Sequence, residues 1–118
     1  MRTIVFYRTR AGRSPVEDFL RGLAAKQVQK VDWVLRIIRG MDDVPAQYFK
    51  KLPGTDGLWE VRVQQGGDAF RLLAFHDGAA MVVLVSAFAK KTEQTPMLEI
   101  ELAQQRRRDY LSRRSGNG

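Results

Sequence analysis

The segment GLWEVRVQQGGDAFRLLAFHDGAAMVVLVSAFAKK, residues 57–91, decides the fold. Its first part alternates between apolar residues, Trp59, Val61 and Val63, and polar residues, among them Glu60 and Arg62. A period of two is typical of a β-strand that packs one face on a core. We therefore predict a strand over residues 58–64, with Glu60 and Arg62 on the face away from the core.

Two glycine-containing segments divide the remainder. Gly66-Gly67 has the composition of a hairpin turn, and His76-Asp77-Gly78 predicts a second reversal. Between and after them, residues 69–75 and 80–88 are rich in apolar and β-branched residues. The run at 80–88 is the most apolar in the chain and suits a central strand. The whole segment thus predicts a three-stranded antiparallel meander.

Towards the N-terminus, Thr3 to Arg8 (TIVFYR) predicts one further short strand. Ser14, Pro15 and Glu17 then provide a helix N-cap, a proline in the first turn and the acidic residue of a capping box. A helix over about residues 15–23 follows from these signals.

A second helix is predicted from Lys26 to Gly40. It is followed by a connecting stretch over residues 42–56, which contains two prolines. Thr95 and Pro96 repeat the signal of an N-cap followed by proline and predict a last helix. The apolar residues that define the second helix recur at helical spacing: Val28, Val31, Leu35 and Ile38.

This order of elements indicates an α+β fold, in which an N-terminal strand, a helix hairpin, the meander and a C-terminal helix follow one another. We expect the helices to pack on one face of the sheet and leave the other face open or half open. The 118 residues suit a single domain over residues 1–114, with a disordered tail at 115–118.

Composition limits the classes of function. Twenty lysines and arginines against 13 acidic residues give a net charge of +7, and such a field favours a polyanion. There is no cysteine, which excludes disulfides and thiolate sites. No run reaches the roughly 18 apolar residues of a membrane span, and no signal-peptide segment precedes the first strand. We expect a cytoplasmic protein without a membrane partner.

Four basic residues are expected to converge. Arg62 and Arg71 lie on strands joined by a hairpin, and Lys90 and Lys91 end the strand next to Arg71. Like charges on neighbouring strands repel, so their retention suggests that an anion sits between them. The alternative is that the two arginines form surface ion pairs with neighbouring acidic residues.

Such a set suits RNA cleavage without a metal or another cofactor. The internal 2′-hydroxyl is the nucleophile, and arginine and lysine neutralise the charge that builds on the phosphorus. Proton transfer falls to Lys90 or Lys91, with Glu60 as a candidate base. The single histidine, His76, is predicted to be a solvated turn residue, and the acidic residues show no metal-ligand spacing.

Further basic residues are candidates for RNA binding. The pair Lys50 and Lys51 lies in the connecting stretch, and Tyr110 in the last helix could stack on a base. An equally acceptable interpretation of the last helix is a solvated helix end, since basic residues are favoured there by the helix dipole. Three consecutive arginines precede this tyrosine and are assigned to phosphate contacts: Arg106, Arg107 and Arg108.

The motifs together resemble the RelE/HigB toxins, and more closely their phage-derived branch. The resemblance is dense from about Leu52 to Arg108. It rests on a glycine-led strand with aromatic, glutamate and arginine residues, on an arginine strand, and on a lysine pair that leads into a helix. The matching segments are Gly57–Arg62, Phe70–Leu73 and Ala87–Pro96, with Glu99 and Ala103.

The resemblance implies the toxin of a type II toxin–antitoxin system: a ribosome-dependent mRNA endoribonuclease that inhibits translation. It also implies a cognate antitoxin of helix-turn-helix type and gives active-site roles to Arg62, Arg71, Lys90 and Lys91. Some relatives carry a stacking tyrosine where this chain has Thr92–Thr95, with no aromatic residue. The alternatives are a ParE-like inhibitor of DNA gyrase and a non-catalytic regulator that binds nucleic acid.

Overall fold

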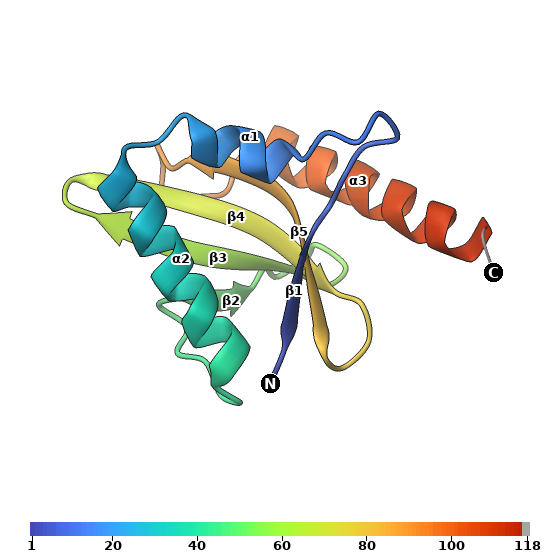
Figure 1. Ribbon diagram of the computed structural model, residues 1–118, viewed down its shortest axis with the longest axis horizontal. Coiled ribbons are helices and arrows are strands. Elements are labelled where there is room, and N and C mark those ends of the chain that lie inside the picture. The colour runs from blue at the N-terminus through green and yellow to red at the C-terminus, as the bar shows by residue number, and fades with distance from the viewer. Residues whose placement is uncertain (117–118) are drawn as a thin grey trace.

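The computed structural model describes residues 1–116 and confirms the α+β class (Figure 1). A mixed five-stranded sheet carries two helices from the first half of the chain and one from its end. The elements in chain order are β1 (Thr3–Phe6), α1 (Pro15–Arg21), α2 (Ala25–Gly40), β2 (Phe49–Lys51), β3 (Leu58–Gln65), β4 (Asp68–His76), β5 (Met81–Ala89) and α3 (Met97–Gly116).

The sheet has the strand order β1-β5-β4-β3-β2. Strands β3, β4 and β5 form the predicted antiparallel meander, and β1 pairs with β5 in parallel. The short strand β2, which pairs antiparallel with β3, lies inside the stretch that was predicted to be a connection. Three residues between two prolines carry too little alternation to be detected from sequence.

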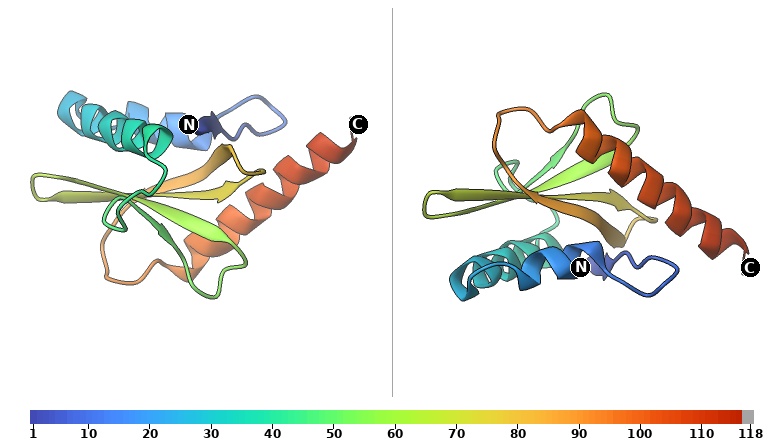
Figure 2. Two further views of the ribbon diagram at one scale, coloured as in Figure 1. Left: turned by 90° about the horizontal axis from the view of Figure 1, so that it is seen from below. Right: turned by 90° about the horizontal axis from the view of Figure 1, so that it is seen from above.

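The prediction that all helices lie on one face of the sheet is wrong for α3. Figure 2 shows α1 and α2 on one side of the sheet and α3 on the other. Neighbouring residues of β4 point to opposite faces of the sheet: Leu72 packs in the core under α1 and α2, whereas Leu73 and Phe75 pack with Ala103 of α3. Because both faces of the central strands are apolar, each face needs a cover.

The first core lies between the sheet and the α1–α2 hairpin. Helix α2 faces this core as predicted: Val31, Leu35 and Ile38 of the stripe are buried, together with Val34, and Val28 is half-buried. Val61 and Val63 of β3 are also buried in this core, as their alternation predicted.

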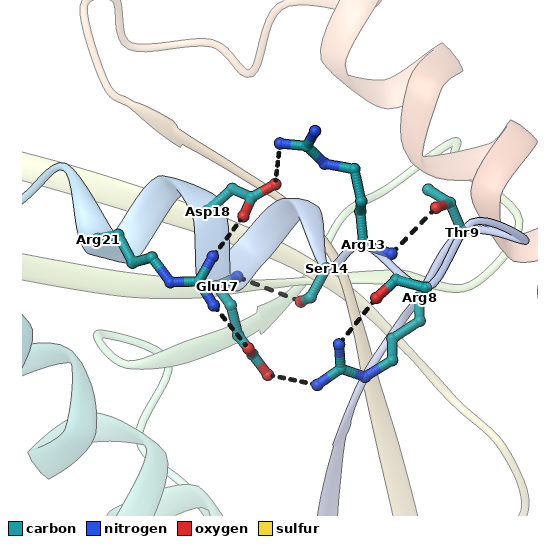
Figure 3. A network of polar contacts seen from close by, with 8 residues as sticks. Arg8, Thr9, Arg13, Ser14, Glu17, Asp18 and Arg21 are labelled. Atoms are coloured by element: carbon teal, nitrogen blue, oxygen red, sulfur yellow. Dashed lines mark hydrogen bonds and ion pairs between the residues drawn. The ribbon is translucent and has the colours of Figure 1, made fainter.

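Helix α1 begins as its sequence predicts (Figure 3). The Ser14 Oγ accepts a hydrogen bond from the Glu17 amide at 3.2 Å, and Pro15 occupies the first turn. The Glu17 carboxylate does not complete the predicted capping box: it pairs with Arg8 at 3.1 Å and with Arg21 at 3.7 Å, so the first turn is also joined to the chain after β1. Such a cap contributes about 1 kcal/mol.

At the C-terminus, α3 extends through Gly116, so the first two residues of the predicted tail, 115 and 116, belong to this helix. The other two, 117 and 118, lie outside the described residues. Within residues 1–116, every helix is too short or too polar to span a bilayer.

Candidate functional site

Arg62 of β3 and Arg71 of β4 lie opposite each other in the antiparallel register. Directly paired residues share one face of a sheet, so both side chains are on the α3 face, next to Glu60. The prediction that the two arginines lie close together is therefore correct. Their repulsion needs a counter-charge, and the structure provides one.

Glu60 is that counter-charge. Its Oε1 lies 3.5 Å from Arg62 Nε and 3.4 Å from Arg71 Nε, and its Oε2 accepts a hydrogen bond from Thr95 Oγ1 at 2.6 Å. The side chains of Glu60 and Arg71 are only 7% and 9% exposed, whereas that of Arg62 is 32% exposed. Both carboxylate oxygens of Glu60 therefore have partners, and its negative charge lies between the two guanidinium groups.

Thr95 therefore has a different role from the predicted helix cap. Its hydroxyl bonds to Glu60, and the backbone carbonyl of Pro96 accepts from the first amides of α3. The loop between β5 and α3 is thereby connected to the arginine pair.

The Arg71 guanidinium is held firmly. Its Nη1 donates to the backbone carbonyl of Phe70 at 3.0 Å. Burial lowers the pKa of Arg71, while the charge of Glu60 opposes the shift. A guanidinium starts from so high a pKa that it stays charged at neutral pH, so this group is a fixed cation rather than a proton carrier.

A cavity of about 480 Å³ opens beside this pair, between residues of α2 and β3. Arg62, Arg71 and Lys90 all line it. No aspartate or glutamate belongs to its lining as far as the described residues show. Its remaining lining residues are Lys30, Val34, Gln47, Tyr48, Val63 and Gln64.

Lys90 is fixed at the end of β5. Its amide donates to the Ala69 carbonyl at 2.8 Å, and its Nζ lies 3.8 Å from the carboxylate of Glu93. Since the Glu93 side chain is 97% exposed, this ion pair is weak and leaves the ammonium available to another anion.

Lys91 does not line the large cavity. It lies in an adjoining small hollow that also contains Arg71 and Lys90, formed with the loop over residues 92–96. The four predicted cations are therefore neighbours, with three in one cavity and the fourth beside it.

The lysine pair of β2 is divided between the two faces of the sheet. Lys50 pairs in register with Glu60 and so lies on the arginine face, whereas Lys51 pairs with Trp59 and lies on the opposite face. Both side chains are exposed. Only Lys50 is on the same face as the cavity arginines.

The arginines of α3 mostly make contacts within the fold. Arg106 Nη1 donates to the Val85 carbonyl and to Ser86 Oγ, both at 2.9 Å, and burial lowers the pKa of Arg106. The pairing of β4 with β5 has an irregularity that leaves Val85 without a partner residue on β4. Arg106 therefore provides a hydrogen-bond donor for the carbonyl of Val85. Arg107 donates to the Asp56 carbonyl, whereas Arg108 is exposed.

Tyr110 is also held in the fold. Its hydroxyl donates to Asp77 at 2.9 Å, and its ring meets Phe75 edge-on with centroids 5.6 Å apart. Burial and the bond to Asp77 raise the pKa of Tyr110. The side chain lies in a region distinct from the cavity that contains the arginines.

His76 is the last residue of β4, not a solvated turn residue as predicted. It is half-buried, and its ring lies edge-on to Trp59 and Phe49, with centroids 5.2 and 5.9 Å away. Burial, with a smaller contribution from the charge of Arg2, lowers the pKa of His76. Across residues 1–116, no three His, Cys, Asp or Glu side chains come together as metal ligands would.

Sequence reasoning missed the other wall of the cavity. Lys30 of α2 lies outside the apolar stripe of its helix, where no sequence pattern marks it. Gln47 and Tyr48 precede the unpredicted strand β2, where no periodic signal marks them. The amide of Arg62 donates to the Tyr48 carbonyl at 2.8 Å, and this backbone pairing brings Tyr48 beside the arginines.

The arrangement can bind a phosphodiester. Arg62, Arg71 and Lys90, from β3, β4 and the end of β5, line one cavity, and the two guanidinium groups lie beside a buried carboxylate. Guanidinium groups bind phosphate with two parallel hydrogen bonds and stabilise charge that develops on its oxygens.

The comparisons with known proteins agree with this fold. None of the curated proteins matches the chain. The family model described as phage derived protein Gp49-like (DUF891) matches residues 18–108, which include the end of α1, the whole of α2, the meander and α3 as far as Arg108. The chain is therefore a member of the Gp49-like family of phage-derived proteins, which has the RelE/ParE-like toxin fold.

Proposed function

We infer that the protein is a toxin that cleaves messenger RNA on the ribosome and that a cognate antitoxin neutralises it. The observation that carries this proposal is the cavity lined by Arg62, Arg71 and Lys90, with no carboxylate among its described lining residues. Membership of the Gp49-like family supports the same function.

The reaction requires three contributions. The 2′-hydroxyl attacks the adjacent phosphorus, passes its proton to a solvent water and forms a 2′,3′-cyclic phosphate, while the bond to the 5′-oxygen of the next nucleotide breaks. Arg62 and Arg71 stabilise the extra negative charge of the transition state, and rigid donors are effective in that role. Lys90 donates a proton to the leaving 5′-oxygen, a step that guanidinium groups do not perform at neutral pH.

The ribosome is expected to hold the 2′-hydroxyl in line with the leaving 5′-oxygen. The carboxylate nearest to the arginines is already occupied by them, so the cavity itself offers no strong base to the 2′-hydroxyl. Positioning of the attacking oxygen in line with the leaving group then contributes much of the acceleration. We therefore expect naked RNA to be cleaved poorly.

The test is cell-free translation of a reporter message, with cleavage sites mapped by primer extension. Wild-type protein is expected to stop translation and cut the message, whereas Lys90→Ala is expected to be inactive. Arg36→Ala provides a control, because Arg36 is an exposed residue of α2 outside the cavity. Each variant is checked by thermal melting.

Other outcomes would identify other functions. Intact messages together with a DNA-damage response in expressing cells would indicate a ParE-like gyrase inhibitor. The absence of any growth effect from a folded protein would indicate a non-catalytic binding protein. Efficient cleavage of RNA without ribosomes would contradict the ribosome-dependent mechanism.

The antitoxin is part of the same proposal. A small helix-turn-helix protein encoded beside this chain is the expected partner. Its co-expression should restore translation, and co-purification would measure the complex directly.

A further inference from the structure

A second hollow, of about 470 Å³, adjoins the cavity on the exposed side of α2. It contains two lysines and one tryptophan, and no acidic residue lines it within the part of the chain that is described. Its lining residues are Lys26, Gln29, Lys30, Trp33 and Gln65.

The two hollows form one continuous surface. Lys30 lines both of them, and the consecutive residues Gln64 and Gln65 line one each. Trp33 of the second hollow meets Tyr48 of the first edge-on, with ring centroids 5.5 Å apart. An extended ligand in the cavity would therefore reach Trp33 without crossing a ridge of acidic side chains.

Helical spacing explains why these residues share one side of α2. Lys26, Gln29, Lys30 and Trp33 stand at positions i, i+3, i+4 and i+7, which are neighbours on one helix face. Residues of the core stripe, such as Val34, are buried, but Trp33 is 40% exposed. An indole on the solvent side of a helix, beside a cationic cavity, has the composition of a stacking site for single-stranded nucleic acid.

We propose that the α2 surface formed by Lys30, Trp33 and Tyr48 binds the RNA nucleotide adjacent to the scissile phosphodiester, with its base stacked on Trp33 and its phosphate bound by Lys30. This inference rests on the proposed function, and it assigns a subsite outside the cleavage site. It also gives the chain a stacking residue, which the loop over residues 92–95 lacks.

The contact between Lys30 and Trp33 is compatible with this role. Lys30 Nζ lies 4.4 Å from the centroid of the indole ring, as in a cation–π pair. An exposed cation–π contact is weak. When the ammonium moves to a phosphate, that face of the indole becomes free for a base. The free energy gained from stacking the base and neutralising the phosphate is larger than that of the cation–π contact given up.

The test uses a short single-stranded RNA with 2′-O-methyl groups, which binds but cannot be cleaved. Fluorescence anisotropy of a labelled strand measures affinity, and quenching of tryptophan fluorescence reports stacking. Loss of one stacked base is expected to make Trp33→Ala bind about five- to hundredfold more weakly. Trp33→Phe keeps a ring, so it should bind better than Trp33→Ala while losing the quench.

Salt dependence tests the phosphate contact separately. Lys30→Ala should reduce the slope of log affinity against log salt concentration by about 0.7, which is the value for one phosphate contact to a single strand. Arg36→Ala is the matched control, since it removes one positive charge from the same helix outside both hollows. Its slope should equal that of the wild type.

Three results would overturn the proposal. Wild-type affinity in folded Trp33→Ala would remove the stacking residue, and an unchanged slope in Lys30→Ala would remove the phosphate contact. Variants that bind RNA normally but escape the antitoxin would show a protein-binding surface instead. If the wild type binds this RNA through Trp33 yet cuts no message, the proposed ribonuclease function fails while the RNA-binding surface stands.

Discussion

Replacing Glu60 with glutamine would remove the negative charge between Arg62 and Arg71 while keeping almost the same side-chain shape. The carboxylate lies within 3.5 Å of both guanidinium groups. The single oxygen of glutamine can still accept from Thr95, and its amide nitrogen, which cannot accept a hydrogen bond, then faces the two arginines. The change therefore removes the negative charge and the acceptor that the arginines share, while the packing is largely kept.

The expected loss of stability follows from burial. Removing one partner of a buried ion pair costs about 3–5 kcal/mol when the other stays buried. Arg71 stays buried, but Arg62 is partly exposed and can be solvated, and the bond from Thr95 is retained. We therefore expect the free energy of unfolding to fall by about 2–3 kcal/mol. In a chain of this length that lowers the melting temperature by about 10 °C.

Inorganic phosphate gives a second measurement. In Glu60→Gln the cavity cations lack their counter-ion, so a bound anion should stabilise the variant more than the wild type. Calorimetric melting across a phosphate titration measures both effects. Glu93→Gln is the control, because its side chain is 97% exposed and its pairing with Lys90 is weak, so its stability should change by less than about 0.5 kcal/mol.

A Glu60→Gln variant that melted within about 2 °C of the wild type would show that the charge of Glu60 does not hold the arginine pair together. Equal stabilisation of both proteins by phosphate would show that the arginines do not depend on Glu60 for charge compensation.

Three further predictions concern other parts of the molecule. Burial lowers the pKa of His76, so the folded state favours the neutral imidazole. The contribution of the neutral imidazole to stability is present above about pH 6.5 and is lost as the pH falls below that value. The melting temperature should therefore drop more between pH 7 and pH 5 in the wild type than in His76→Gln. Tyr110→Phe loses the hydrogen bond to Asp77 and should destabilise the protein by about 1 kcal/mol in a urea melt. Its RNA affinity, measured by anisotropy, should stay unchanged. A weaker affinity would show that Tyr110 contacts RNA after all. In the translation assay, Lys90→Ala should lose more activity than Lys91→Ala, because only Lys90 lines the large cavity, and equal losses would contradict that assignment.

Much of the fold could be predicted from local patterns. Alternation at Val61 and Val63 gave the orientation of β3, and Ser14 with Pro15 marked the start of α1. These signals depend on neighbours in the chain, so no long-range contact is needed to interpret them.

The placement of α3 and β2 could not be predicted in the same way. The choice of sheet face for α3 depends on which apolar surface remains uncovered after α1 and α2 have packed. Strand β2 exists because β3 offers an edge to pair with, rather than because Phe49–Lys51 has a strong pattern of its own.

The candidate site shows the same division. The strong positive charge could be predicted from the residue types alone, and the proximity of Arg62 and Arg71 from the register of one hairpin. Only the tertiary structure decided which cations are available to a ligand: Arg106 already donates to the carbonyl of Val85, whereas Lys90 faces an open cavity. The reason is that the charge of a side chain follows from its type, while its freedom to bind an anion depends on whether distant parts of the chain already supply its hydrogen-bond partners.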